Sequence, residues 1–212
     1  NKIIKNKKFY KFNGLAIDSR DIKKDNLFLA IKGNKNDGNK FISKAIKKGA
    51  SYYATSKNYT NIKNKKIKID NPILFLNKFA KLKRENSNAK IIAITGSVGK
   101  TSLKNMLYEL LLRYGNTCCS PRSFNNHFGV PVSLSNLNLN HQFGVFEVGM
   151  SKAGEINKLS KLIKPDLGVI TNVAEAHIEN FNNIEGIASA KSEIINNIKD
   201  GGKVILNRDD KF

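Results

Sequence analysis

A glycine-rich turn at residues 96–101, which reads Gly-Ser-Val-Gly-Lys-Thr, is the clearest sign of chemistry in this sequence. It lies between an apolar stretch that predicts a buried strand and a segment with leucines at helical spacing. In that setting the backbone N–H groups of the turn and the positive end of the helix can bind phosphate oxygens. Lys100 would reach the outer phosphates of a nucleotide, and Thr101 would bind Mg²⁺. The full phosphate-loop pattern has a glycine where this chain has Ile94, but the turn still predicts nucleotide binding.

Two further polar residues occupy places where ligands bind. Glu147 interrupts the apolar strand predicted at 143–148, near the end of the strand where ligands bind in parallel sheets. A buried carboxylate there must be paired or bound to a metal, whereas the alternative is a solvent-facing residue on an edge strand. His177 follows the strand predicted at 167–171 after a short loop and could reach the same crevice. The alternative for His177 is a purely structural loop residue.

Lys191 lies within the apolar face of the helix predicted at 184–198. At ~100° per residue it shares one arc with the isoleucines at 187, 194, 195 and 198. Desolvation would lower the pKa of this lysine and leave a nucleophilic neutral amine, which can add CO₂ to form a metal-binding carbamate. In the alternative, the stem packs while the ammonium reaches water, and the periodicity by itself favours that interpretation.

Strands and helices that alternate along the second part of the chain would position these candidate site residues. The predicted strands are 91–95, 143–148, 167–171 and 204–206, and the predicted helices are 101–113, 153–163 and 184–198. Such alternation indicates an α/β fold with a mostly parallel sheet and helices on both of its faces. Because the last strand is followed by only six residues, we expect the sheet to be incomplete at the C-terminus.

The first part of the chain predicts a smaller α/β domain. Strands are expected at 15–17, 27–31, 51–55 and 67–69, with one helix at 41–48 and another that begins at Asn71-Pro72. A polar run at 83–88 ends the second helix and is typical of a linker. We therefore divide the chain into an N-terminal domain at 1–84, a linker at 85–89 and a central phosphate-loop domain at 90–212.

Composition narrows the class of protein. The 212 residues carry a net charge of +20, and 23 basic against 6 acidic side chains lie in residues 1–87. Most of these basic residues are scattered lysines without interleaved aromatic residues, which favours a solvated surface over a nucleic-acid interface. The adjacent Cys118 and Cys119 are poorly placed for a disulfide, which favours a reducing, cytoplasmic setting. No stretch approaches the ~18 apolar residues of a membrane span.

Taken together, the motifs resemble those of the Mur ligases, ATP-dependent enzymes that add amino acids to the UDP-linked precursor of peptidoglycan. Their phosphate loop, TGxxGKT, also lacks the earlier glycine, and residues 95–101 match it. Within the family, residues 124–131, 147–156 and 172–177 are most similar to the ligase that adds D-alanyl-D-alanine. Residues 18–20, 27–33 and 37–38 resemble the family's uridine-diphosphate-binding domain.

The resemblance implies a role for each motif. The residues implied in ATP binding are Gly96, Ser97, Val98, Gly99, Lys100, Thr101, Ser102, Asn125 and Asn126. Thr101 and Glu147 would hold one Mg²⁺, while His177 and a carbamylated Lys191 would hold a second. The implied catalytic residues are Lys100, His177 and Lys191. Ser19 and Arg20 would bind the UDP group.

The implied reaction joins D-alanyl-D-alanine to UDP-N-acetylmuramoyl-tripeptide through an acyl phosphate, with ATP and Mg²⁺ as cofactors. The alternatives are a Mur ligase that adds a single amino acid and another P-loop enzyme. Residues 207–210 resemble the guanine-reading motif of GTPases, but the accompanying DxxG motif is missing. A basic nucleic-acid-binding module is the remaining alternative. Because the family's third domain has no counterpart here, we expect this chain to be inactive by itself. We also expect it to be a monomer.

Overall fold

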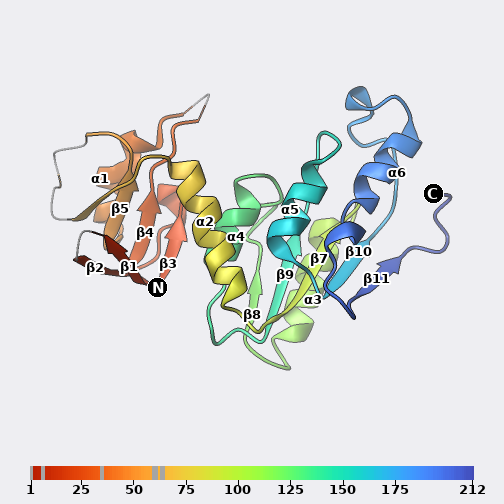
Figure 1. Cartoon of the computed structure of the whole chain (residues 1–212), viewed down its shortest axis with the longest axis horizontal. Helices are drawn as coiled ribbons and strands as arrows, with labels where there is room; N and C mark the ends of the chain where they lie inside the picture. Colours follow the sequence, from red (N-terminus) through yellow and green to blue (C-terminus); the bar gives the residue numbers. More distant parts are fainter. Residues whose placement is uncertain (1, 6–7, 34–35, 59–61, 63–64) are drawn as a thin grey trace. The chain divides into compact units, whose positions relative to one another are not determined.

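A computed structural model describes residues 2–5, 8–33, 36–58, 62 and 65–212 of the chain. The chain forms two compact units, Asn1–Phe79 and Ala80–Phe212, which Figure 1 traces in sequence order. Each unit contains a parallel sheet of its own. Across the described residues, no helix has the length and apolar character needed to cross a lipid bilayer.

The first unit is built on a four-stranded parallel sheet in the order β3-β4-β5-β6. Its strands are β3 (Gly14–Ala16), β4 (Asn26–Leu29), β5 (Tyr52–Thr55) and β6 (Lys66–Lys68), close to the predicted positions. The 3-10 turn Gly38–Phe41 leads into α1 (Ile42–Lys47), whose buried Ile42 and Ala45 belong to a core with Phe28 and Tyr53. An antiparallel hairpin of β1 (Lys2–Lys5) and β2 (Lys8–Lys11) was not predicted, because lysine at all four strand ends obscures the apolar pattern.

The second unit contains a five-stranded parallel sheet in the order β11-β10-β7-β9-β8. Its strands are β7 (Lys90–Thr95), β8 (Thr117–Cys119), β9 (Phe143–Glu147), β10 (Leu167–Ile170) and β11 (Lys203–Leu206). This sheet confirms the predicted parallel α/β architecture. The edge strand β8 was not predicted, since three residues are too few to show a period.

Helices cover both faces of this sheet. On one face, α3 (Lys100–Leu111) packs its leucines against the side chains of Ile94, Val145 and Val169. On the other face lie α4 (Gly129–Ser135), α5 (Glu155–Ile163) and α6 (Ile184–Ser192). Alternate residues of a strand point to opposite faces, so Glu147 shares the α3 side with Val145. The helix predicted to run to residue 198 ends at Ser192, and a separate 3-10 turn follows at Ile195–Asn197.

Helix α2 (Pro72–Glu85) contains the division between the two units, which lies between Phe79 and Ala80. The expected linker at 85–89 is instead packed into the second unit, where Ser87 and Ala89 are buried. Arg84 is also buried, and its guanidinium donates to the carbonyl oxygens of Ser87, Ile163 and Lys164 at 3.2, 2.6 and 2.8 Å. The polar composition misled because these backbone acceptors accommodate the charge inside the fold.

Candidate functional site

The turn that follows β7 and the first turn of α3 form an anion-binding geometry. Gly96 and Gly99 adopt φ values of +144° and +82°, which favour glycine. The backbone N–H groups of residues 99–102 have no hydrogen-bond acceptor in the part of the chain that the structure describes. Lys100 folds back over the turn, and its Nζ donates to the carbonyl oxygens of Gly96 and Ser97 at 2.7 and 3.2 Å. A phosphate therefore finds free donors and the positive end of a helix together.

The segment that follows β10 holds the beginning of this turn. Asn172 Oδ1 accepts from the N–H groups of Ser97 and Val98 at 3.1 and 2.9 Å. Thr171 Oγ1 donates to the carbonyl oxygen of Val98 at 2.6 Å, and Ser97 Oγ bonds to both the oxygen and the N–H of Ala174. In this arrangement the amides of Ser97 and Val98 are already occupied, so the phosphate-binding donors begin at Gly99. In the sequence, Asn172 directly follows a strand and begins the motif at 172–177, but neither feature indicates that it holds this turn.

Glu147 stands at the carboxyl end of β9, which is an inner strand of the sheet. Its side chain is only 1% exposed, so the solvent-facing alternative does not apply. One carboxylate oxygen accepts from Thr101 Oγ1 at 2.7 Å, and the other accepts from Asn125 Nδ2 at 2.7 Å. Glu147 has no salt-bridge partner among the described residues. A buried carboxylate next to a hydroxyl offers the oxygen ligands that suit a hard cation.

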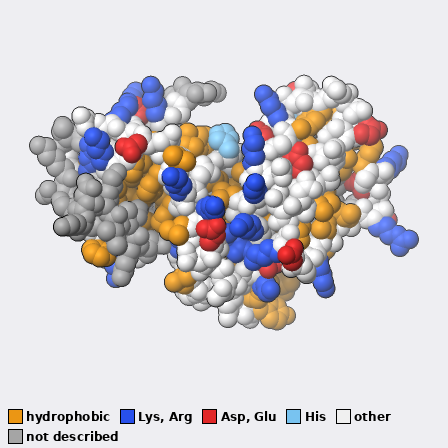
Figure 2. All heavy atoms as spheres, viewed as in Figure 1, with side chains coloured by type: hydrophobic (Ala, Val, Ile, Leu, Met, Phe, Trp, Pro, Cys, Tyr) orange, Lys and Arg blue, Asp and Glu red, His pale blue; other side chains and the backbone are white. Residues whose placement is uncertain are grey.

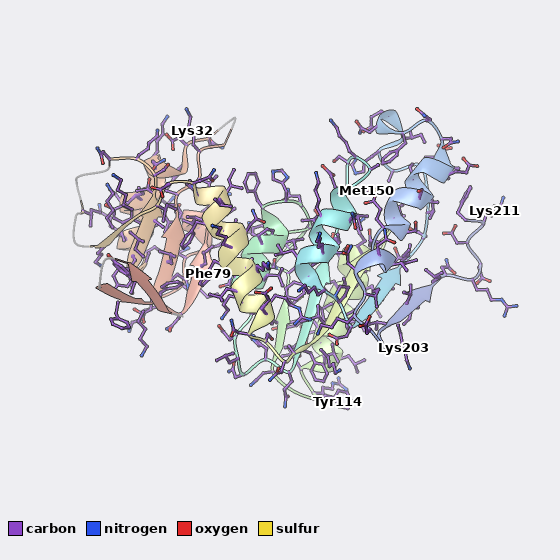
Figure 3. The ribbon with its side chains drawn as sticks, in the orientation of Figure 1. Lys32, Phe79, Tyr114, Met150, Lys203 and Lys211 are labelled. Carbon is purple, nitrogen blue, oxygen red and sulfur yellow. The ribbon has the colours of Figure 1, made fainter. Side chains whose placement is uncertain are left out.

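A cavity of about 500 Å³ lies beside the turn, entirely within the second unit. It is lined by Gly96, Ser97, Lys100, Asn125, Asn126, His127, Gly149, Met150, Ser151, Glu155, Lys158, Leu159, Ala176, His177 and Lys191. Met150, labelled in Figure 3, belongs to the segment that leads from β9 into α5. The cavity thus brings together the predicted residues Lys100, His177 and Lys191. Its α5 wall includes Glu155, which lies in the motif at 147–156 but was given no role, and Lys158, an exposed helix residue with no distinct signal in the sequence.

The other residues predicted to bind ATP border the site in different ways. The side chains of Val98 and Ser102 are exposed, and neither residue lines the cavity. Asn126 lines it, but its Oδ1 accepts from the N–H groups of Phe128 and Gly129 at 3.1 and 2.9 Å. The side-chain oxygen of Asn126 is therefore occupied by the N–H groups at the start of α4.

Lys191 and His177 differ in how far their side chains are exposed in the cavity. Lys191 is only 3% exposed, on the same buried face of α6 as Ile187, so its amine does not escape to bulk water. Burial, and to a smaller extent the nearby charge of Lys100, lowers the pKa of Lys191 to about 8. The His177 side chain is 52% exposed, with Nδ1 3.8 Å from a carboxylate oxygen of Glu179. The cavity therefore presents one desolvated amine and one accessible imidazole.

The lowered pKa of Lys191 predicts how its amine reacts with pH. We expect acetylation by an amine-directed reagent to rise through pH 8, whereas an ordinary lysine follows a pKa of about 10.4. At pH 7 about a tenth of the Lys191 amine would be neutral, which is the form that reacts. Mass spectrometry of the chain labelled between pH 6 and pH 11 measures this, with the exposed Lys158 as reference. A Lys191 profile centred near pH 10.4 would contradict the prediction.

Ser19 and Arg20, the residues predicted to bind UDP, belong to the first unit. They form the 3-10 turn Ser19–Asp21, which Asp18 caps by accepting from the Arg20 N–H at 2.8 Å. Ser19 is buried, and the Arg20 side chain is 73% exposed and paired with Asp18 at 2.7 Å. The second-unit cavity contains neither residue.

Comparison with known proteins identifies the family. Residues 94–212 match the Mur ligase middle domain, and residues 11–91 match the Mur ligase family, catalytic domain. The chain is 42% identical over 196 residues to the UDP-N-acetylmuramoyl-tripeptide–D-alanyl-D-alanine ligase of Rickettsia prowazekii, covering 92% of this chain and 43% of that protein. It is 34% identical over 200 residues to the ligase of the same name from Bacillus subtilis, covering 93% and 44%.

Solved structures give the same result. A crystal structure of MurF from Acinetobacter baumannii matches with a TM-score of 0.80 and 33% identity, covering 95% of this chain and 44% of that one. MurF from Thermotoga maritima in complex with ADP matches with a TM-score of 0.75 and 30% identity, covering 93% and 46%. The chain spans less than half the length of these relatives. Because both sequence and fold match over nearly all of its residues, the chain belongs to the Mur ligase family.

Proposed function

We propose that the protein containing this chain joins D-alanyl-D-alanine to UDP-N-acetylmuramoyl-tripeptide, using ATP and Mg²⁺. The observation that carries the proposal is the cavity, which gathers Lys100, His177 and Lys191 next to the hydrogen bond between Thr101 and the buried Glu147. The names of the relatives support the choice of substrates, and the ADP complex of one of them supports the nucleotide. We place the reaction in the cytoplasm and expect a monomer.

Free donors at the start of α3 would bind the phosphates of ATP. The N–H groups of residues 99–102 would hold them, and Lys100 would leave its two carbonyl partners to neutralise the outer phosphate. Mg²⁺ fits the residues present, because Thr101 and Glu147 already place two oxygen ligands next to each other, and no described lysine or arginine forms a salt bridge with Glu147. When bound, the ion supplies neutralisation of the phosphate charge.

A carboxylate must be activated before an amine can attack it. In the proposed reaction, a carboxylate oxygen of the tripeptide attacks the γ-phosphorus of ATP, ADP leaves, and an acyl phosphate forms. The amine of D-alanyl-D-alanine then attacks the carbonyl carbon, loses a proton, and displaces phosphate to give the amide. In the first step, the positive charge of Lys100 reduces the repulsion between the tripeptide carboxylate and the γ-phosphate.

We place the acceptor carboxylate next to His177 and Lys191, which line the same cavity as Lys100. A free amine is a poor ligand for Mg²⁺, whereas a carbamate on Lys191 would offer oxygen ligands. The lowered pKa of Lys191 favours the neutral amine that adds CO₂. Ser19 and Arg20 of the basic first unit would bind the UDP group.

The alternatives lack a comparable observation. In the segment that resembles the guanine-reading motif, the Asp210 carboxylate accepts from the N–H groups of Val173 and Phe212 at 2.7 and 3.2 Å, so it is occupied. On the face shown in Figure 2, lysine and arginine side chains are scattered and interleaved with acidic ones. A nucleic-acid interface would instead gather them along one groove.

The choice of the amine substrate, which attacks the activated carboxylate, tests the proposal. We expect the full-length protein that contains this chain to release phosphate from ATP with Mg²⁺ and UDP-N-acetylmuramoyl-tripeptide only when D-alanyl-D-alanine is present. A free diamino acid, offered instead, should give no release above background. Release that requires the single amino acid would assign the protein to the other type of Mur ligase. Absence of release with either acceptor would contradict the ligase function.

A further inference from the structure

Lys104 is a fully buried lysine that neither the sequence motifs nor the proposed mechanism uses. It lies on α3, one turn after Lys100, and is only 1% exposed. Its Nζ donates to the carbonyl oxygens of Ser120, at 3.0 Å, and of Arg122. Among the described residues it has no salt-bridge partner. Lysine is almost never buried to this degree without a specific partner, so these backbone contacts require an explanation.

The two carbonyl groups belong to the segment 120–125, which connects β8 to the loop before α4. This segment turns sharply, because Arg122 has a φ of +49°, a value that a non-glycine residue rarely adopts. Most backbone groups in such a turn cannot form strand or helix hydrogen bonds. Within the segment, the N–H groups of Phe124 and Asn125 donate to the carbonyl oxygens of Pro121 and Ser123 at 3.1 and 2.8 Å. The ammonium of Lys104 adds two donors to these bonds.

The same segment supplies the surroundings of the Thr101–Glu147 pair. Ser120 Oγ accepts from the backbone N–H of Glu147 at 3.2 Å, and Ser123 Oγ lies 3.5 Å from Thr101 Oγ1. Asn125 Nδ2 donates to the Glu147 carboxylate at 2.7 Å. Two residues of this segment therefore contact the side chains of Thr101 and Glu147, which we assign to Mg²⁺, and a third contacts the backbone of Glu147.

Asn125 has little freedom to adjust if the segment moves. Its carbonyl oxygen accepts from the N–H of Gly149 at 2.8 Å. A Cβ added to Gly149 would lie 2.9 Å from Cγ of Asn125, so the two residues are in close contact. Any shift of the segment would thus be transmitted to the hydrogen bond between Asn125 and Glu147.

We propose that Lys104 is a positioning residue that fixes the segment 120–125, so that Ser120, Ser123 and Asn125 hold Glu147 and Thr101 for the Mg²⁺-nucleotide. The identity of that ligand rests on the proposed function, whereas the fixing of the segment does not. Lys104 acts only through this segment. If Lys104 were replaced, Thr101, Glu147 and Asn125 would all still be present near the ligand. Only their alignment with each other would be lost.

Hydrogen exchange of the ligand-free chain tests the fixing of the segment. We expect Lys104→Met to speed exchange of the Phe124 and Asn125 amides by about tenfold or more, while the later amides of α3 keep their protection. Lys104→Gln, which keeps two donors without the charge, should restore part of the protection. It also serves if the methionine variant folds poorly.

The matched control is Lys83→Met, since Lys83 is half-buried in the same unit and its Nζ donates to Asn138 Oδ1 at 3.1 Å. This control should leave exchange at residues 120–125 unchanged. Exchange in that segment that is the same in Lys104→Met as in the wild type would overturn the inference. A uniform increase throughout the second unit would also overturn it, because that result indicates a general loss of stability.

Binding of ADP at increasing Mg²⁺ concentration tests the consequence for the metal. Lys104→Met should need about tenfold more Mg²⁺ for half-maximal binding, with ADP binding in the absence of Mg²⁺ unchanged. A general loss of stability would weaken both. If the full-length wild-type protein showed no Mg²⁺-dependent ADP binding, the proposed function would fail, and hydrogen exchange alone would decide the role of Lys104.

Discussion

Glu147→Gln is expected to lower Mg²⁺-dependent phosphate release by the full-length protein by about a thousandfold. The carboxylate is buried, and its two oxygens accept hydrogen bonds from Thr101 and Asn125. Glutamine removes the negative charge and replaces one acceptor with an NH₂ group, which would face the donor of either Thr101 or Asn125. The variant would therefore lose the oxygen ligand that we propose for Mg²⁺ and disturb the two residues that align it. Steady-state phosphate release over a range of Mg²⁺ concentrations measures the effect.

The control for this variant is Glu155→Gln, because Glu155 lines the same cavity. Its carboxylate accepts from the backbone N–H groups of Ser151 and Lys152 at 2.6 and 3.3 Å. Loss of the Glu155 charge should reduce activity far less, since we assign Glu155 no contact with the nucleotide or with Mg²⁺. Equal losses in the two variants, or full activity of Glu147→Gln, would contradict the role given to Glu147.

Gly96→Ala is expected to destabilise the chain by roughly 3 kcal/mol and to remove ADP binding. The φ of +144° at Gly96 is unfavourable for any side chain. In addition, a Cβ there would lie 1.9 Å from Thr171 Oγ1. That hydroxyl cannot easily move, because it donates to the carbonyl oxygen of Val98. The turn would have to change shape to accept the methyl group.

Gly99→Ala separates the effect of the positive φ from the effect of the clash with Thr171. Gly99 also has a positive φ, but a Cβ added to it meets no atom within 4 Å. Urea unfolding of both variants should therefore show a clearly larger loss of unfolding free energy for Gly96→Ala. The same loss in both would mean that backbone strain alone matters and that Thr171 does not restrict the turn.

Local patterns in the sequence were sufficient to predict the framework of the site. The alternation of apolar and polar segments predicted the parallel sheet, because each strand and helix has a period of its own. The glycines around Lys100 indicated the phosphate-binding turn, since a positive φ favours glycine. Glu147 and Lys191 stood out because each is a charged residue on an otherwise apolar face, and the structure buries both.

Features that depend on distant contacts could not be predicted. Asn172 occupies the amides of Ser97 and Val98 from more than seventy residues away, and nothing near Asn172 in the sequence indicates this. Helix α6 ends early where the Glu193 carboxylate turns to the N–H groups of Gly154 and Asn157, at the start of α5. Such contacts form only once the sheet has placed the loops side by side.

Lys104 shows where a local signal was present but too weak to interpret. At about 100° per residue it borders the apolar arc formed by Leu103, Leu107 and Leu111, as a half-exposed lysine would. Its burial depends on the carbonyl groups of Ser120 and Arg122, which belong to a short irregular segment. Irregular segments carry no period from which such acceptors could be recognised.

The most direct test of the proposed reaction follows one oxygen atom. The terminal carboxylate of UDP-N-acetylmuramoyl-tripeptide is labelled with ¹⁸O and incubated with the full-length protein, ATP, Mg²⁺ and D-alanyl-D-alanine. If the carboxylate attacks the γ-phosphorus, its oxygen leaves with the phosphate, and mass spectrometry will find one ¹⁸O in each phosphate released. Amide product accompanied by phosphate without ¹⁸O would contradict activation of the acceptor through an acyl phosphate in this site.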